Sequence, residues 1–179
     1  MKYANRLLQR LVGRLAFWMP GGASLRPALH RFRGVNLGKN VWISQQVYLD
    51  ELYPEAITIG DNCTLGLRTS IFSHFHWGLR RDQGGFKPVV LEANVFLGPH
   101  CVILPGVRIG DGAVIKAGSV LTRNVPARIF WGGPGGKPLA RVTVPLTSAG
   151  SYDEFMRGLK PISEAEVAEQ GVEGDEYWI

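Results

Sequence analysis

The fold is decided by the stretch LEANVFLGPHCVILPGVRIGDGAVIKAGSVL, residues 91–121. A large aliphatic residue recurs there at every sixth position without a miss, at Leu91, Leu97, Ile103, Ile109, Ile115 and Leu121. A period of six matches neither the 3.6-residue turn of an α-helix nor the two-residue alternation of a strand. The repeated unit is therefore a short strand followed by a tight corner, and three such units close one triangular coil.

A second position of each hexad is also restricted. Four residues after each aliphatic side chain comes a small or β-branched one, at Val95, Cys101, Val107, Ala113, Ser119 and Val125. The same register appears upstream at Leu37, Ile43 and Leu49 and again at Ile59, Leu65 and Ile71, with residues 50–58 as a short insertion. Stacked repeats bury such side chains against their equivalents one coil away. We predict an all-β solenoid whose roughly four coils occupy residues 35–126 of a domain spanning 34–133.

The composition fits one globular domain with modest additions, because the chain has 179 residues of which 45% are hydrophobic. The formal charge of +5 is uneven, since no acidic residue precedes Asp50 and acidic residues dominate from Asp153 onward. Cys63 and Cys101 show neither a disulfide framework nor a metal-binding spacing, and we expect both in the core. No run reaches the ~20 apolar residues of a membrane span. These features predict a cytoplasmic protein.

The two ends differ in character. Residues 2–19 place Arg6, Arg10 and Arg14 on one helical face and leucines with Trp18 on another, which predicts a basic amphipathic helix within an N-terminal region 1–33. We expect this helix to cap the solenoid, and peripheral contact with the inner face of a membrane stays open as the alternative. Residues 134–179 form an irregular or partly helical extension with a solvated acidic tail. The cations lack interleaved aromatic residues, which argues against nucleic-acid binding.

The run GVRIGDGAVIKAGSVLTRNVP (106–126), followed by WGGPGGKPLARV (131–142), closely resembles the hexapeptide-repeat acyltransferases. Within them the chain looks most like sugar and polysaccharide O-acetyltransferases of the colanic-acid and maltose-acetyltransferase type. The resemblance implies a left-handed parallel β-helix, acetyl-CoA as the acyl donor, no metal, and a homotrimer with active sites between subunits. It further implies a sugar, polysaccharide or lipid-linked glycan as the acceptor.

The six-residue periodicity is interrupted in TSIFSHFHWGLRRDQGGFKP, residues 69–88. Residues 77–88 are predicted to form a long loop that leaves the solenoid, which we call the excursion. In the resembling enzymes the catalytic histidine follows the run IGDNCTLG (59–66 here) and immediately precedes such a loop. The resemblance therefore implies His76 as general base, with His74 as the nearby competitor. A neutral imidazole with a pKa of about 6.5 can accept a hydroxyl proton near pH 7. The alternative is that either histidine only hydrogen-bonds a corner carbonyl.

The resemblance also implies a donor site. It places the pantetheine arm of coenzyme A along the corner formed by Lys116, Ala117 and Gly118, where Lys116 replaces the usual glycine. It brings Thr122 and Arg123 to the family's threonine-lysine step, and Lys137 and Arg141 to the end that meets the phosphates. The alternative for each cation considered alone is that it is an ordinary surface charge that keeps the solenoid soluble.

Zinc binding at His100 is not expected, because Pro105 stands where the related γ-class carbonic anhydrases have their second histidine ligand. The sequence thus predicts an acetyl-CoA-dependent O-acetyltransferase that works by direct transfer. Two rivals stay open. One is an N-acetyltransferase of an amino sugar or small amine, and the other is a catalytically silent β-helix scaffold.

Overall fold

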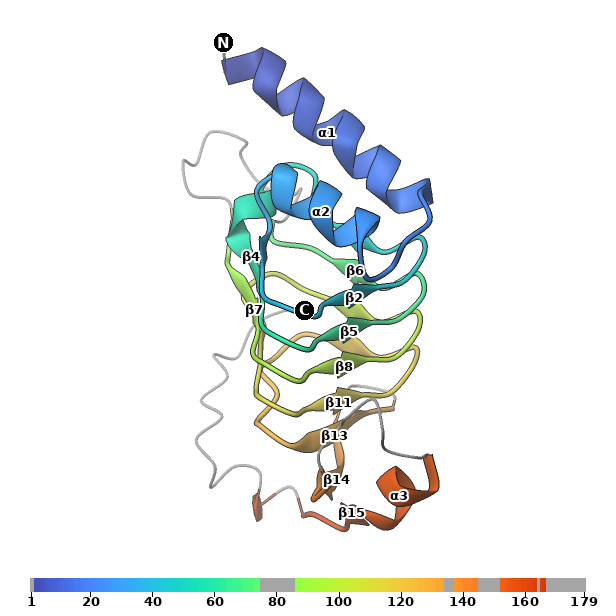
Figure 1. Ribbon diagram of the computed structural model, residues 1–179. Coiled ribbons are helices and arrows are strands. Elements are labelled where there is room, and N and C mark those ends of the chain that lie inside the picture. Colours follow the sequence, from blue (N-terminus) through green and yellow to red (C-terminus); the bar gives the residue numbers. More distant parts are fainter. Residues whose placement is uncertain (1, 75–85, 134–136, 145–151, 164, 167–179) are drawn as a thin grey trace.

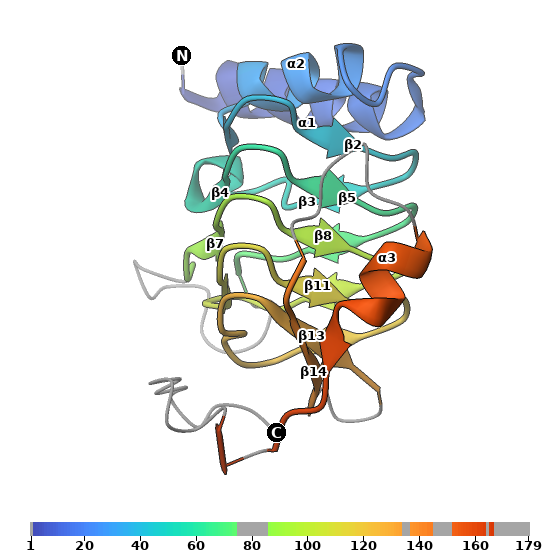
Figure 2. The ribbon, with the colours of Figure 1, turned by 60° about the horizontal axis from the view of Figure 1, so that its bottom comes forward.

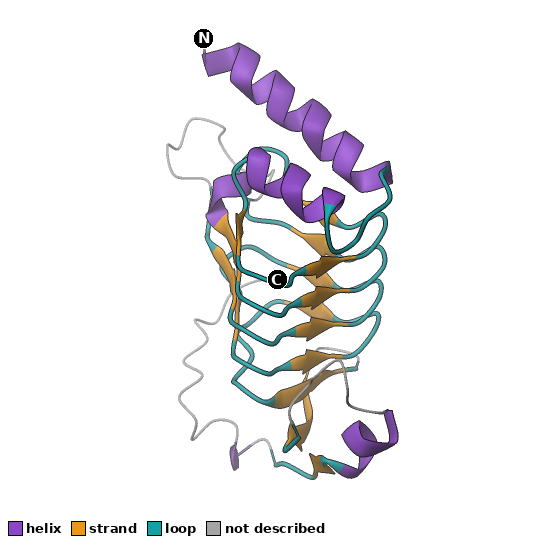
Figure 3. Ribbon diagram, viewed as in Figure 1, coloured by secondary structure: helices purple, strands orange, loops and turns teal. Residues whose placement is uncertain are grey.

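The computed structural model describes residues 2–74, 86–133, 137–144, 152–163 and 165–166. Its helical elements are α1 (Lys2–Trp18), α2 (Leu25–Phe32), the short 3-10 helix η1 (Pro54–Ala56) and α3 (Tyr152–Arg157). Strands of two to six residues fill the region between, and helices α1, α2 and α3 lie at its two ends (Figure 3). The predicted all-β solenoid with an N-terminal helix and a partly helical C-terminal extension is confirmed.

Three sheets form the sides of a prism (Figure 1). Sheet A consists of β1 (Asn36–Leu37), β4 (Ile57–Ile59), β7 (Val89–Leu91) and β10 (Arg108–Ile109). Sheet B begins with β2 (Trp42–Ile43), β5 (Thr64–Leu65), β8 (Phe96–Leu97) and β11 (Val114–Ile115). Sheet C consists of β3 (Tyr48–Leu49), β6 (Ser70–Ile71), β9 (Val102–Ile103) and β12 (Val120–Leu121). All these pairings are parallel, so each coil visits A, B and C in turn, and four coils are complete.

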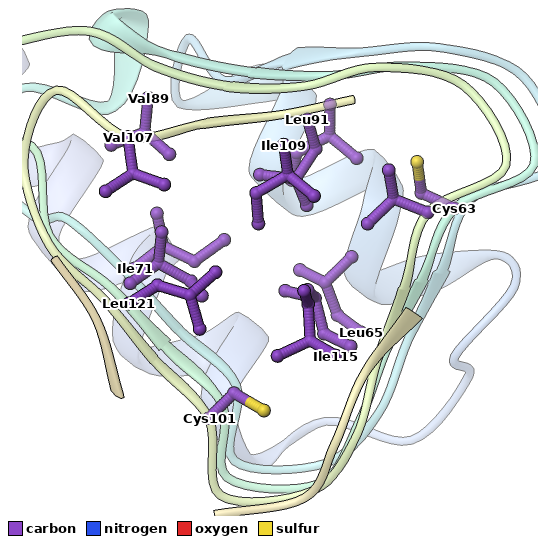
Figure 4. Packing of buried hydrophobic residues seen from close by; sticks show 14 of the residues in the cluster. Cys63, Leu65, Ile71, Val89, Leu91, Cys101, Val107, Ile109, Ile115 and Leu121 are labelled. Atoms are coloured by element: carbon purple, nitrogen blue, oxygen red, sulfur yellow. The ribbon is translucent and has the colours of Figure 1, made fainter. Parts of the chain in front are cut away.

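The aliphatic residues of the hexads fill the prism. Figure 4 shows Leu91, Leu65 and Ile71 pointing inward from the three sheets, with the equivalent residues of another coil stacked on them. The inward residues of β5, β6, β8, β9, β10 and β11 have no exposed surface. Burying each is worth about 1.5–3 kcal/mol before the cost of ordering the chain is subtracted. The predicted ladder is confirmed.

The two cysteines occupy the small inward positions predicted for them, and both are fully buried free thiols. Burial raises the pKa of the Cys63 thiol to about 11 and raises that of Cys101 as well. A thiol with a raised pKa carries little thiolate at neutral pH, so neither is suited to act as an acyl nucleophile.

The corner between sheets A and B carries a ladder of amides that the hexad pattern did not reveal. The Asn40 amide donates to Asn62, and the Asn62 amide donates to Asn94, each over 3.2 Å. The Asn94 amide in turn donates to the Asp111 carboxylate over 2.8 Å. All three asparagines have φ between 53° and 59°, the left-handed region that asparagine tolerates better than most residues. The side chain that suits the corner therefore also links the coils.

One end of the prism is covered by α2, which contacts β1 and β2 of the first coil. Its Arg26 and the following Arg33 are almost fully buried, with Arg26 Nε donating to the Ile43 carbonyl over 2.7 Å and Arg33 to the carbonyls of Leu49 and Asp50. Helix α1 lies on α2, and the two stand side by side over the same end (Figure 2). The cap expected of residues 2–19 is thus formed chiefly by α2, whose own amphipathic pattern was not recognised.

The opposite end closes differently. β13 (Ile129–Gly132) adds to β11 in parallel, and β14 (Lys137–Val142) then turns back and pairs with β13 antiparallel. β15 (Leu159–Lys160) pairs antiparallel with β14 in turn. Helix α3 packs beside this hairpin at the bottom of Figure 1. The parallel stacking of coils therefore ends at β13.

Because His30 of α2 is buried, we expect the protein to lose stability in acid. It is 2% exposed, and neither ring nitrogen has a hydrogen-bond partner among the described residues. Burial, with the charges of Arg33 and Arg26, lowers its pKa from 6.5 to about 3. Between about pH 6.5 and pH 3 this histidine is protonated in the unfolded chain but not in the folded one. The free energy of unfolding therefore falls as the pH is lowered through this range. The loss at pH 4 is about 3 kcal/mol.

Urea unfolding at pH 7 and at pH 4 measures this effect. His30→Phe should remove most of the difference between the two pH values, because the ring stays apolar in both states. His100→Gln is the matched control, since His100 is exposed. If the pH 7 to pH 4 difference is the same in His30→Phe as in the unchanged protein, His30 is not the source.

Candidate active site

The long excursion leaves and rejoins the prism at one point. His74, three residues after β6, forms an antiparallel bridge with Phe86, and the Lys87 amide donates to the Ser73 carbonyl over 2.8 Å. This point lies on the edge where sheet C passes into sheet A, which we call the C–A edge. The predicted base His76 and residues 77–85 lie outside the described residues.

His74 is held by a buried carboxylate. Its Nδ1 lies 2.5 Å from Oδ2 of Asp50, and the two residues are 6% and 0% exposed. A carboxylate at Nδ1 favours a hydrogen on that nitrogen and holds the ring in one orientation. The arrangement is that of a histidine whose orientation and tautomer are fixed, which suits either a base or a group that positions one.

Asp50 is tied down by three backbone amides as well. Its Oδ2 accepts from Ser73 N at 2.8 Å, and its Oδ1 accepts from Leu52 N at 2.9 Å and Tyr53 N at 3.3 Å. Burial alone would raise the pKa of this carboxyl. The amides of Ser73 and Leu52, together with His74, outweigh burial and hold the pKa below its ordinary value. Asp50 is therefore ionised at neutral pH.

The sequence reasoning missed Asp50, although a signal was present. It is the first acidic residue of the chain, and it directly follows the inward Leu49 at the point where the insertion 50–58 breaks the hexad register. A carboxylate next to the core is costly unless it is paired, which marks such a position as functional or structural.

Two aromatic rings border the His74 imidazole. The ring of Tyr53 lies 5.6 Å from that of His74 in a T-shaped arrangement and stacks on Phe86 at 5.2 Å. Tyr53 comes from the insertion 50–58 and Phe86 from the returning end of the excursion. Both interruptions of the hexad pattern therefore meet at the same edge, on successive coils.

Part of the predicted donor set lies on a different edge, between sheets B and C. Lys116, Ala117 and Gly118 form the exposed corner between β11 and β12. Gly132 of the next turn packs against this corner so closely that a Cβ there would stand 2.5 Å from the Cβ of Lys116. Lys137 pairs with Gly132 across the β13–β14 hairpin. The structure thus brings Lys116 and Lys137 to one place, which we call the B–C edge.

The other predicted donor residues are placed elsewhere. Thr122 and Arg123 are exposed on the C–A edge directly after β12, two coils below His74 or roughly 10 Å along the prism. Arg141 is half-buried on β14, where it pairs with Ile129 and Lys160. Within one chain the predicted donor residues are therefore divided between two edges and the terminal hairpin.

The described residues contain no group of three or more histidine, cysteine, aspartate or glutamate side chains placed to hold a metal ion. His100 is exposed at the corner between β8 and β9 with φ of 60°, the left-handed conformation that the corner requires.

Comparison with known families places the repeats. The sequence profile described as "Bacterial transferase hexapeptide (six repeats)" matches residues 88–123, and that described as "Hexapeptide repeat of succinyl-transferase" matches residues 56–73. Among curated proteins, a putative acetyltransferase of Bacillus subtilis is 35% identical over 102 residues, covering 57% of this chain and 58% of the relative. The galactoside O-acetyltransferase of Escherichia coli is 33% identical over 103 residues, covering 55% and 50%. The chain thus spans about half the length of these relatives.

Among solved structures, a hexapeptide-repeat-containing acetyltransferase of Vibrio cholerae, complexed with acetyl coenzyme A, superposes with a TM-score of 0.63 at 26% identity. The match covers 78% of this chain and 87% of the other. A galactoside acetyltransferase in complex with coenzyme A has the same fold, with a TM-score of 0.60 at 24% identity and coverage of 77% and 80%. The matched repeats and the shared prism show that the solenoid is a left-handed parallel β-helix built from hexapeptide repeats, and the chain is similar to hexapeptide-repeat acetyltransferases.

Proposed function

We propose that the chain is an acetyl-CoA-dependent O-acetyltransferase whose acceptor is a hydroxyl of a sugar, a polysaccharide or a lipid-linked glycan. The observation that carries the proposal is the Asp50–His74 pair, which stands on the C–A edge at the base of the excursion in a hexapeptide-repeat prism. A buried, oriented imidazole beside a loop is costly to maintain and is typical of acid–base sites. The acetyl-CoA-bound relative supports the choice of donor.

In the proposed reaction His76 is the general base. It accepts the proton of the acceptor hydroxyl, and the oxygen attacks the carbonyl carbon of the thioester. A tetrahedral oxyanion forms, stabilised by a backbone amide of the coil, and the C–S bond then breaks to release the coenzyme thiol, which takes up the proton. His74, held by Asp50 through Nδ1, positions the base rather than contacting the acceptor.

The donor site is proposed to form between neighbouring prisms of a homotrimer. The cations at Lys116 and Lys137 lie on the B–C edge, whereas Thr122 and Arg123 lie on the C–A edge below His74. A three-fold assembly can bring one edge of a prism toward a face of the next, and phosphate groups pair well with such cations. Mutant subunits mixed in trans, one lacking His76 and one lacking Lys116 and Lys137, would show whether two chains share a site.

The reaction class is tested by following thiol release from acetyl-CoA across a panel of sugars, oligosaccharides and lipid-linked glycans. Product analysis separates the rivals, because an O-acetyl ester is released by mild alkali and an amide is not. An alkali-stable product on an amino sugar would favour the N-acetyltransferase. Failure of acetyl-CoA to bind the intact protein would favour the silent scaffold and reject the proposal.

Asp50→Asn is expected to lower kcat on the order of 10- to 100-fold while leaving the KM for acetyl-CoA nearly unchanged, because the amide no longer fixes the His74 tautomer. Its pH–rate profile should also shift, since a nearby negative charge has been removed. Asp61→Asn is a useful control, because Asp61 also accepts a backbone N–H bond, from Lys39, but at the A–B corner. Equal losses in both variants would mean that general destabilisation, not the His74 contact, is responsible.

A further inference from the structure

Helix α1 presents an apolar face that nothing in the described chain covers. Its exposed residues are Leu7 (61%), Leu8 (48%), Leu11 (54%), Leu15 (46%) and Trp18 (66%). At 3.6 residues per turn they fall within roughly 100° of the helix circumference and form one continuous strip, which we call the apolar strip. Exposed apolar surface gathered in this way on one element marks an interaction site rather than ordinary surface variation.

The leucines of the strip lie on the side of α1 opposite the packed face, and Trp18 also borders a cavity shared with Val47 and Leu49 of the first coil. The opposite side of α1 packs on α2, with Ala16 only 1% exposed and Gly13 close enough to Arg33 that no larger residue would fit. Figure 1 shows α1 as the outermost element at its end of the prism. The strip is therefore not needed to hold α1 in place.

Cations flank the strip on one side. Arg6, Arg10 and Arg14 are exposed and occupy the adjoining sector of the helix, between the strip and the packed face. None of them forms an ion pair within the described part of the chain, and no acidic residue occurs before Asp50. Glu51 borders the cavity that Arg10 and Arg14 also line, but among the described residues it pairs with neither of them. The surface thus combines a hydrophobic strip with a row of positive charge that outnumbers the nearby carboxylate of Glu51.

We propose that α1 docks on the surface of an anionic lipid bilayer. The apolar strip would enter the boundary between headgroups and acyl chains, and the three arginines would meet the lipid phosphates, as in other interfacial amphipathic helices. None of the helices among the described residues combines the length and the apolar character that a membrane crossing needs, so the contact is peripheral. The proposal does not depend on the reaction proposed above.

A second copy of the chain is a poorer occupant of this face. Burying two apolar strips against each other would also bring two rows of arginines together, and residues 1–49 hold no carboxylate to separate them. Like charges brought together at an interface cost affinity. An anionic lipid surface satisfies the leucines and the arginines at once.

The test uses the full chain and sedimentation with two kinds of vesicle, phosphatidylcholine alone and phosphatidylcholine mixed with phosphatidylglycerol in equal parts. Binding to the anionic vesicles, weakened by salt, is expected. Leu11→Glu with Leu15→Glu should lower partitioning at least about tenfold, since glutamate keeps helix propensity but cannot enter the interface. Arg6→Gln and Arg14→Gln should each lower it about fivefold, the value of one cation near an anionic surface.

Met156→Glu is the matched control, because Met156 is 47% exposed on α3 at the other end of the prism. Quenching of Trp18 fluorescence by brominated acyl chains, lost in Trp18→Phe, would place the strip in the bilayer. Circular dichroism shows whether each variant keeps its helix. Light scattering tests the rival, which is self-association through the apolar strip. The proposal would be overturned if Leu11→Glu with Leu15→Glu left vesicle binding unaffected. It would also be overturned if the protein did not bind vesicles and formed an oligomer that these changes dissociate.

Discussion

His76→Ala should lower kcat about 10²- to 10⁴-fold, the usual contribution of a positioned general base. The KM for acetyl-CoA should change little, because the predicted donor residues are Lys116 and Lys137 on the B–C edge and Thr122 and Arg123 two coils below His74. Single-turnover thiol release measures the chemical step directly. Far-ultraviolet circular dichroism and the thermal midpoint should match those of the unchanged protein, since the proposed role of His76 is chemical and not structural.

His74→Ala is expected to behave differently, and the contrast makes the assignment testable. Removing this imidazole deprives the buried Asp50 carboxylate of the partner that lies 2.5 Å from it. Turnover should fall, and the free energy of unfolding should also fall, by about 1–3 kcal/mol. His100→Ala, on an exposed corner, should change neither. A folded His76→Ala protein with undiminished turnover would rule out His76 as the base, and a loss confined to His74→Ala would transfer that role to His74.

Ile103→Asp should abolish folding at room temperature. Ile103 lies in β9, a central strand of sheet C, and is fully buried between Ile71 and Leu121 of the adjacent coils. The change forfeits about 1.5–3 kcal/mol of burial and adds the larger cost of an unpaired charge in the core. Together these reach the 5–15 kcal/mol by which most domains are stable. Expression in the soluble fraction and the urea midpoint measure the effect.

Val120→Asp on the same sheet serves as the comparison. Val120 is 48% exposed and points out of the prism, so the same chemical change should cost no more than about 1 kcal/mol through strand propensity. Comparable losses at both positions would mean that the inward and outward assignments of the hexad are mistaken.

The fold could be predicted from the sequence because the hexad repeats one steric requirement many times. Each inward residue packs against the equivalent residue of the coil above and below. Leu97 and Ile115, which are paired on adjacent coils, are therefore independent examples of the same pattern. The amide ladder was not predicted because asparagine is common in tight corners for local reasons. Only the stacking of the coils shows that Asn62 lies beside Asn94 and donates to it. Helix α2 was not predicted because its eight residues bury Arg26 and His30, which reverses the usual polarity of an amphipathic face.

The candidate site was predictable only in part, for a geometric reason. The break in the ladder directed attention to His74 and His76, and His74 does stand at the base of the excursion. Its carboxylate partner comes from 24 positions earlier, one coil above, and nothing local in the sequence links the two. Similarly, Lys116 and Arg123 are seven positions apart in the chain yet lie on different edges of the prism. Sequence proximity in a solenoid says little about which edge a residue occupies.

The reversal of direction at β14 has a consequence for the solution behaviour of the molecule. A prism of parallel coils exposes, at each end, a set of strands onto which another prism could stack, and indefinite stacking would produce a fibre. Helix α2 blocks one end, and the antiparallel β13–β14 hairpin occupies sheet B at the other. Removing residues 137–163 should therefore expose one open end and favour end-to-end pairing of two prisms, while α2 at the other end still prevents growth into a filament.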